Sequence, residues 1–246
     1  MVRTGQMILM QALKRHILGE SFQLHMLQDI HVRKEYFSIL KLFMDNITDG
    51  SKAPFGIHNI CLEGKKSDIK PGQWYGPHMI SVVLKNICNQ YNKIPGFKMH
   101  VCIDSNIFLD EIEALIKKGL SVFLMIPLRL GINSIQSTYL EQLKYLFQIY
   151  NNVGIAGGKD HMALYLLGDE DRNNPKSGLF YLDPHFVQNA VPKVEVDVPL
   201  DQMNMLPYLD SYHCKDLRML SLSDMCTSMA PGFYIRDEEM FNVWKL

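Results

Sequence analysis

The sequence has little cysteine, and its cysteines lie far apart. None of them is in CxxC spacing, and their number is odd: Cys61, Cys88, Cys102, Cys214 and Cys226. A scattered, odd set is typical of reduced thiols rather than of a disulfide framework, which favours a cytoplasmic protein. The zinc patterns CxxC and HExxH are both missing, so we expect no metal site and no cofactor.

The sequence also lacks an excess of charge and a long apolar run. Its 25 Lys and Arg residues nearly balance 26 Asp and Glu residues, which gives a net charge of −1. This balance does not favour nucleic-acid binding. No stretch reaches the roughly 18 apolar residues of a membrane span, so we expect no integral membrane segment. Gln6 and Gln11 interrupt the apolar residues near the start, which is typical of an amphipathic helix rather than of a signal peptide.

The chain contains no repeat and no low-complexity linker, so residues 1–246 are interpreted as a single domain. The first half has helical spacing, and the second half contains several short apolar runs. We expect helices at 5–18, 32–44, 58–65, 78–91, 137–150 and 237–246, and strands at 120–131, 151–159, 161–170 and 177–183, with a last strand that ends near Ile235. Helices followed by antiparallel strands predict an α+β fold, with N-terminal helices packed on a mainly antiparallel sheet.

An acid and an imidazole lie two residues apart, at Asp183 and His185, with Pro184 between them. In an extended chain residues i and i+2 point to the same face, so the two side chains could serve one site. A carboxylate that orients a histidine makes it a general base for a thiol or a hydroxyl. The alternative is a structural ion pair at a turn. No cysteine is well placed as the nucleophile, and Cys214 is the least unfavourable candidate.

Several motifs occur along the chain in the order found in the autophagins, the autophagy-related cysteine endopeptidases with a papain-like fold. The resemblance covers nearly the whole chain, and its strength lies in the combination rather than in any one motif. The motifs are GQM (5–7), APFGIHNI (53–60), GQWYGP (72–77), GIAGGK (154–159) and YLDPH (181–185).

The resemblance implies a substrate and roles for several residues. Autophagins hydrolyse the bond after the C-terminal glycine of a small ubiquitin-like autophagy modifier, first in its precursor and later in its conjugate with phosphatidylethanolamine. By this likeness Asp183 and His185 are the acid and base of a catalytic triad. Trp74 covers the active-site entrance, and the loop of Lys159, Asp160, His161 and Met162 lifts when the substrate tail enters. The implied enzyme is a cytoplasmic monomer that contacts membranes only through its lipid-bound substrate.

The sequence departs from the family pattern in two places. The family commonly has a small residue and a histidine after the loop, where this chain has Met162, Ala163 and Leu164. The family's nucleophile lies in a stretch like GWGCMxRxGQM, and Met1 aligns with the methionine that directly follows the cysteine. Loss of a triad nucleophile costs on the order of 10⁶ in kcat, so we expect the printed chain to be inactive and its start to be too late.

Two other interpretations stay open at this stage. The chain could be a pseudoprotease that binds the modifier without cutting it. It could also be a protease for another ubiquitin-like modifier, on a related fold with an Asp-Pro-His box. The motifs at 53–60 and 72–77 favour the autophagin interpretation.

Overall fold

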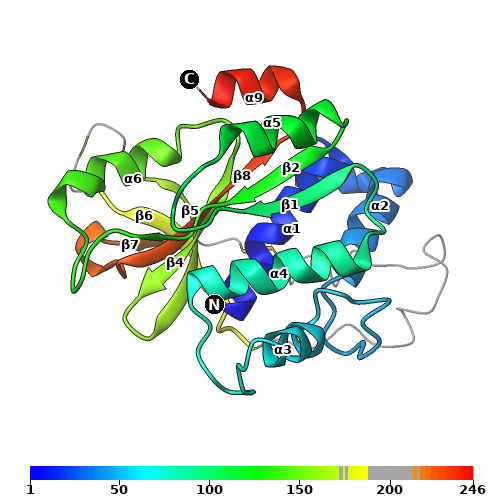
Figure 1. Cartoon of the computed structure of the whole chain (residues 1–246), viewed down its shortest axis with the longest axis horizontal. Helices are drawn as coiled ribbons and strands as arrows, with labels where there is room; N and C mark the ends of the chain where they lie inside the picture. The colour runs from blue at the N-terminus through cyan, green and yellow to red at the C-terminus, as the bar shows by residue number, and fades with distance from the viewer. Residues whose placement is uncertain (172–173, 175–176, 188–212, 215–216, 246) are drawn as a thin grey trace.

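The computed structural model describes residues 1–171, 174, 177–187, 213–214 and 217–245. Within these residues, helices cover both faces of one mixed sheet (Figure 1). The end of the predicted C-terminal helix, at residue 246, lies outside the described residues.

The N-terminal half forms the expected helices, and local signals explain their bounds. Asp29 begins the second helix because its Oδ1 accepts hydrogen bonds from the backbone N–H groups of His31 and Val32, at 2.7 and 3.3 Å. Pro77 occupies the first turn of the fourth helix, where its missing N–H costs nothing. The four predicted helices are confirmed as α1 (Val2–Leu18), α2 (Ile30–Lys41), α3 (Ile57–Lys65) and α4 (Pro77–Tyr91), with a short η1 (Leu24–Gln28) before α2.

The second half builds an eight-stranded sheet in the order β1-β2-β8-β4-β5-β6-β7, with β3 paired to β8. In the described residues every strand pairing is antiparallel except β1–β2, which is parallel and is connected through α5. This confirms the α+β class and the mainly antiparallel sheet. The elements are β1 (Phe97–Val101), α5 (Leu109–Lys117), β2 (Ser121–Met125), β3 (Leu128–Arg129), β4 (Asn152–Lys159), β5 (Met162–Asp169), β6 (Leu179–Leu182), β7 (Arg218–Leu220) and β8 (Ser228–Ile235).

Two sequence expectations need correction. The single strand expected at 120–131 is two strands, β2 and β3, because Pro127 between them has no N–H for a ladder. The helix expected at 137–150 is shorter and forms η2 (Ser137–Tyr139) and α6 (Leu140–Leu146). The helix α5 and the strand β7 were not predicted. A short η5 (Leu222–Asp224) precedes β8, and the expected last helix is α9 (Glu238–Trp244), capped by Asp237.

Alternating residues of β2 place one core on each face of the sheet. Phe123 and Met125 are fully buried against α1 and α4, whereas Val122 and Leu124 are fully buried on the side of α5 and α9. Because both faces are covered, β2 has a continuous apolar sequence instead of an alternating one. The fully buried apolar residues of α1 and α4 are Ile8, Leu9, Ala12, Leu13, Ile80, Val83 and Leu84.

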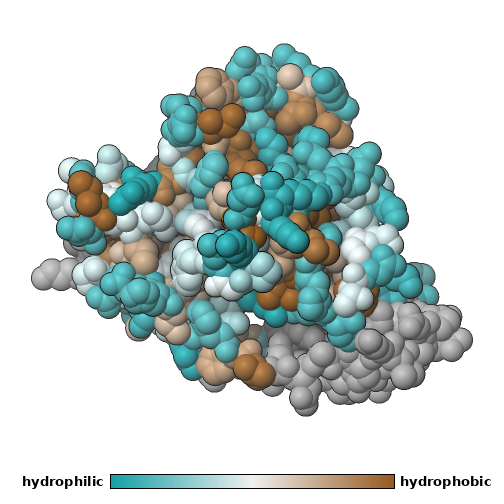
Figure 2. Space-filling model, turned by 60° about the horizontal axis from the view of Figure 1, so that its bottom comes forward, coloured by the Kyte–Doolittle hydropathy of each residue, from teal (hydrophilic) through white to brown (hydrophobic). Residues whose placement is uncertain are grey.

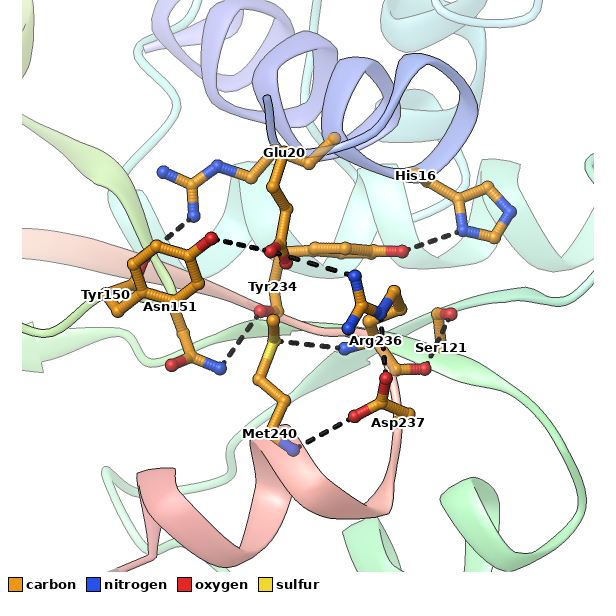
Figure 3. Close-up of polar contacts among 10 residues, drawn as sticks. His16, Glu20, Ser121, Tyr150, Asn151, Tyr234, Arg236, Asp237 and Met240 are labelled. Atoms are coloured by element: carbon orange, nitrogen blue, oxygen red, sulfur yellow. Dashed lines mark hydrogen bonds and ion pairs between the residues drawn. The ribbon is translucent and has the colours of Figure 1, made fainter. Parts of the chain in front are cut away.

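A polar network fixes the C-terminal end of α1 to β8 and α9 (Figure 3). The Tyr150 hydroxyl donates to Glu20 Oε2 at 2.7 Å, and Arg236 Nη1 lies 3.8 Å from the same oxygen. Arg236 Nε also donates to Asp237 Oδ2 at 2.7 Å, while Asp237 Oδ1 accepts from the backbone N–H of Met240. These contacts hold the chain just after α1 against the end of β8 and the start of α9.

Figure 2 shows a face on which hydrophilic residues predominate and hydrophobic residues lie in small separate groups outside the grey atoms. None of the helices in the described residues is long and apolar enough to cross a membrane.

Candidate active site

Asp183 and His185 meet in a turn directly after β6. Asp183 Oδ1 accepts from the backbone N–H of His185 at 2.9 Å and contacts His185 Nδ1 at 2.6 Å. The expectation of an extended chain is therefore wrong, although the two side chains do meet. Pro184 lies in the turn, and the aspartate side chain closes that turn onto the backbone two residues on. The backbone bond and the ring contact together hold the imidazole in one orientation.

The two side chains differ in exposure. The Asp183 side chain is 7% exposed, whereas that of His185 is 50% exposed. Burial by itself raises the pKa of Asp183, but hydrogen bonds from the backbone and ring of His185, with the charges of His185 and Arg218, hold that pKa below its usual value. The carboxylate is therefore ionised at neutral pH, and Nε2 is the nitrogen left to exchange a proton with a reacting group.

His185 opens into a pocket built from four parts of the chain. The first turn of α1 lines one side, and the loop before α4, the start of β5 and the turn after β6 line the others. The lining residues are Met1, Val2, Arg3, Thr4, Gln73, Trp74, Tyr75, Ala163, Pro184 and His185. The pocket therefore joins the predicted base His185 and the predicted entrance residue Trp74 to the amino end of α1.

The amino end of α1 gives this pocket a positive electrostatic character. This character comes from the helix itself, because burial lowers the pKa of the Met1 ammonium group and so disfavours its charge. The first backbone N–H groups of a helix and its dipole stabilise negative charge within the first turn. A thiol at such a position has a lowered pKa and is more readily a thiolate. A group joined to Met1 would thus lie beside His185 in an environment that suits a thiolate.

Trp74 is at the surface, unlike its neighbour Tyr75. Trp74 is 62% exposed, whereas Tyr75 is 5% exposed and packs its hydroxyl under Gly64 of α3, where a Cβ atom would overlap it. The structure thus excludes an ordinary core role for Trp74. The buried Tyr75 anchors the loop and leaves the indole at the pocket.

Lys159, Asp160, His161 and Met162 form the tip of the β4–β5 hairpin, where Lys159 pairs with Met162. His161 has φ 58°, and Lys159, Asp160 and His161 are exposed. None of these four residues is among those that line the pocket, but the next residue, Ala163, is. The hairpin therefore reaches the pocket through Ala163 rather than through its tip.

All five cysteines are in the described residues, and none lines this pocket. Burial raises the pKa of Cys88 to about 12 and that of Cys102 to about 11, so both are unsuited to be nucleophiles. Cys214 is exposed but is not at the pocket either.

Comparison with known proteins identifies the domain. A family model for the peptidase C54 catalytic domain matches residues 1–246. The chain belongs to the peptidase C54 family. It is 30% identical to the probable cysteine protease ATG4 of Eremothecium gossypii over 100% of this chain and 44% of that protein. It is 30% identical to the cysteine protease ATG4B of Gallus gallus over 99% of this chain and 66% of that protein. It is 31% identical to the probable cysteine protease atg4 of Aspergillus niger over 99% of this chain and 57% of that protein.

Membership of the peptidase C54 family confirms the resemblance to the autophagins and the papain-like fold class. The chain spans roughly half to two thirds of the length of these relatives, namely 44%, 66% and 57%.

Sequence reasoning missed several residues of this peptidase C54 site. Thr4 lines the pocket and is fully buried, and its hydroxyl has no hydrogen-bond partner among the residues that the structure describes. The GQM motif, which directly follows Thr4, indicated that this helix belongs to the site but did not include Thr4 itself. Gln73 and Tyr75 lie within the GQWYGP motif, so that signal was present. Arg218 near Asp183 had no sequence signal, because only the pairing of β6 with β7 brings it there.

Proposed function

We propose that this domain belongs to a thiol protease of autophagy that hydrolyses the bond after the C-terminal glycine of a ubiquitin-like modifier. Asp183 orients His185, and His185 exchanges a proton with the thiol and with the leaving amine. The same reaction trims the precursor and releases the modifier from phosphatidylethanolamine. In this proposal the enzyme is a cytoplasmic monomer without metal or cofactor, and it contacts the membrane only transiently.

The observation that carries this proposal is the convergence of His185, Trp74 and the amino end of α1 on one pocket. A cysteine joined to the amino end of Met1 would stand at the helix terminus that favours a thiolate. The imidazole already faces that pocket and is held by Asp183 at 2.6 Å. We propose that this position supplies the nucleophile and that the printed chain lacks activity without it.

The shape of the pocket entrance supports a slim substrate tail. The exposed indole of Trp74, Pro184, His185 and the small Ala163 all line the pocket. A glycine tail has no side chain to clash with an indole. We propose that Trp74 covers this tail and that residues 159–162 move at the hairpin tip when the tail enters.

One observation favours a second candidate, a domain that binds the modifier without cutting it. None of the five cysteines of the printed sequence, all within the described residues, lines the pocket. A third candidate is a protease for another ubiquitin-like modifier, because an Asp-Pro-His turn alone does not select the substrate.

The test compares three chains on modifiers that carry a reporter after the C-terminal glycine. One chain is as printed, one carries Gly-Trp-Gly-Cys before Met1, and one carries Gly-Trp-Gly-Ser. We expect the cysteine chain to release the reporter at least 10³-fold faster than the serine chain, since the thiolate is the nucleophile. Mass spectrometry of the acyl-enzyme would locate the modified cysteine.

The panel includes an autophagy modifier, ubiquitin and a further ubiquitin-like protein. Cleavage of a non-autophagy modifier alone would overturn the proposed substrate. Binding of the autophagy modifier without cleavage by the cysteine chain would instead favour the non-catalytic candidate. The N-terminal peptide of the native protein, read by mass spectrometry, then shows whether a cysteine precedes Met-Val-Arg-Thr.

Replacing Trp74 by alanine should raise KM for the modifier about tenfold. The indole is already 62% exposed, so its removal leaves the core unchanged. The only loss is the contact between the indole and the substrate tail. Steady-state kinetics on the cysteine chain measure this effect. Trp244 lies outside the pocket, so Trp244→Phe is the matched control and should leave KM within twofold.

A further inference from the structure

The two oxygens of Asp183 have different surroundings. Oδ1 receives both contacts from His185, one from its backbone N–H and one from its ring. Oδ2 lies 3.9 Å from Nη1 of Arg218. The carboxylate thus has an imidazole at one oxygen and a guanidinium near the other. The Asp183 side chain is only 7% exposed.

Arg218 also contacts the residue that follows His185. Its guanidinium carbon lies 4.8 Å from the centre of the Phe186 ring, within the range of a cation–π contact. Arg218 can reach both sides of the turn because β7 pairs with β6, with Tyr181 opposite Arg218. The Phe186 ring is 66% exposed, so packing in the core does not fix its position.

We propose that Arg218 is a positioning residue that clamps the Asp183–His185 turn from outside, with its guanidinium between the Asp183 carboxylate and the Phe186 ring. One contact places a positive charge beside the carboxylate, and the other places the guanidinium on the ring of the residue just after the histidine. Arg218 is not among the residues that line the pocket, so it acts through Asp183 and Phe186. The importance of the clamp for catalysis rests on the proposed function, whereas the clamp itself does not.

The other charged groups around the turn do not duplicate Arg218. From α1, the Met1 ammonium and Arg3 line the pocket on the His185 side. Arg3 is directed to Asp45, with which it forms an ion pair. Among the residues that the structure describes, Arg218 is the cation that forms an ion pair with Oδ2, and its charge, with that of His185, lowers the pKa of Asp183.

The first experiment uses the printed chain and needs no activity. We would follow the Asp183 carboxyl carbon by NMR as a function of pH in the wild type, Arg218→Gln and Arg218→Lys. Loss of the guanidinium should raise the Asp183 titration midpoint by about 0.5 pH unit, a small effect because Arg218 is half exposed. Lysine keeps the charge and should restore most of this midpoint.

The stacking half of the clamp has its own readout. The side-chain protons of Arg218 should show a ring-current shift that is lost in Phe186→Ala. Arg236→Gln is the matched control, because Arg236 is similarly exposed and pairs with Asp237 on another part of the fold. An unchanged Asp183 midpoint in Arg218→Gln, or one that shifts equally in Arg236→Gln, would overturn the clamp.

The second experiment places the same variants in the chain that carries the cysteine. Arg218→Gln should lower kcat about tenfold with KM within twofold, because the reacting groups are misaligned while the tail site is intact. Arg218→Lys should recover only part of kcat, since an ammonium group cannot reproduce the planar stacking on Phe186. Unchanged kcat would overturn the catalytic importance of the clamp. A shifted Asp183 midpoint in a chain that cuts no modifier would leave the clamp standing and reject the proposed function.

Discussion

Replacing His185 by alanine in the cysteine-bearing chain is expected to lower kcat about 10⁵-fold. The thiol then has no base, and the leaving amine has no acid. KM should change little, because the tail contacts of Trp74 remain. Single-turnover release of a C-terminal reporter from the modifier measures the loss down to the background rate.

Asp183→Asn should cost less than His185→Ala, about 10²- to 10³-fold in kcat. The asparagine oxygen can still accept from His185, but the negative charge that supports the imidazolium is gone. His25→Ala is the control, because His25 is exposed and lies outside the pocket. If His185→Ala keeps more than a tenth of the activity, His185 is not the base.

Gly5→Val is expected to lower the free energy of unfolding by about 3 kcal/mol, the largest stability effect proposed for the chain. A Cβ at Gly5 would lie 2.5 Å from Ile80 Cγ1 and 3.1 Å from Leu84 Cδ1, at the crossing of α1 and α4. The branched side chain must push these helices apart. Gly5→Ala should cost less, because the gain in helix propensity of about 1 kcal/mol offsets part of the overlap.

Urea unfolding followed by circular dichroism measures this loss. Gly168→Ala is the control, because a Cβ there meets no atom within 4 Å. A loss below 1 kcal/mol for Gly5→Val would show that α1 and α4 repack freely. Since the first turn of α1 and the loop before α4 line the pocket, Gly5→Val should also weaken binding of the modifier, even in the chain that has no nucleophile.

The N-terminal helices could be predicted from the sequence because each has an apolar stripe at helical spacing and a recognisable start, such as Pro77. The helix α5 had the same signal, since its buried Ile112 and Ile116 lie four residues apart, and so it could have been found. The strand β7 could not, because its three residues become a strand only by pairing with β6.

The pairing of Asp183 with His185 was foreseeable from their spacing, but its geometry was not. The contact forms through a turn that the aspartate closes on its own backbone. The contact of Arg218 with Asp183 could not be predicted from the sequence, because more than thirty residues separate the two. The family resemblance supplied the proposed roles of Trp74 and of residues 159–162, which local patterns alone did not indicate.

The burial of the Met1 amino group in the pocket has a practical consequence for handling the protein. A purification tag fused directly before Met1 would start at the pocket that Met1 lines together with Trp74 and His185, and would compete with any substrate tail for that space. The C-terminal helix α9 lies on the opposite face of the sheet, beside α5 (Figure 1). Affinity handles, fluorophores and surface linkers therefore belong after α9, where they leave the pocket open.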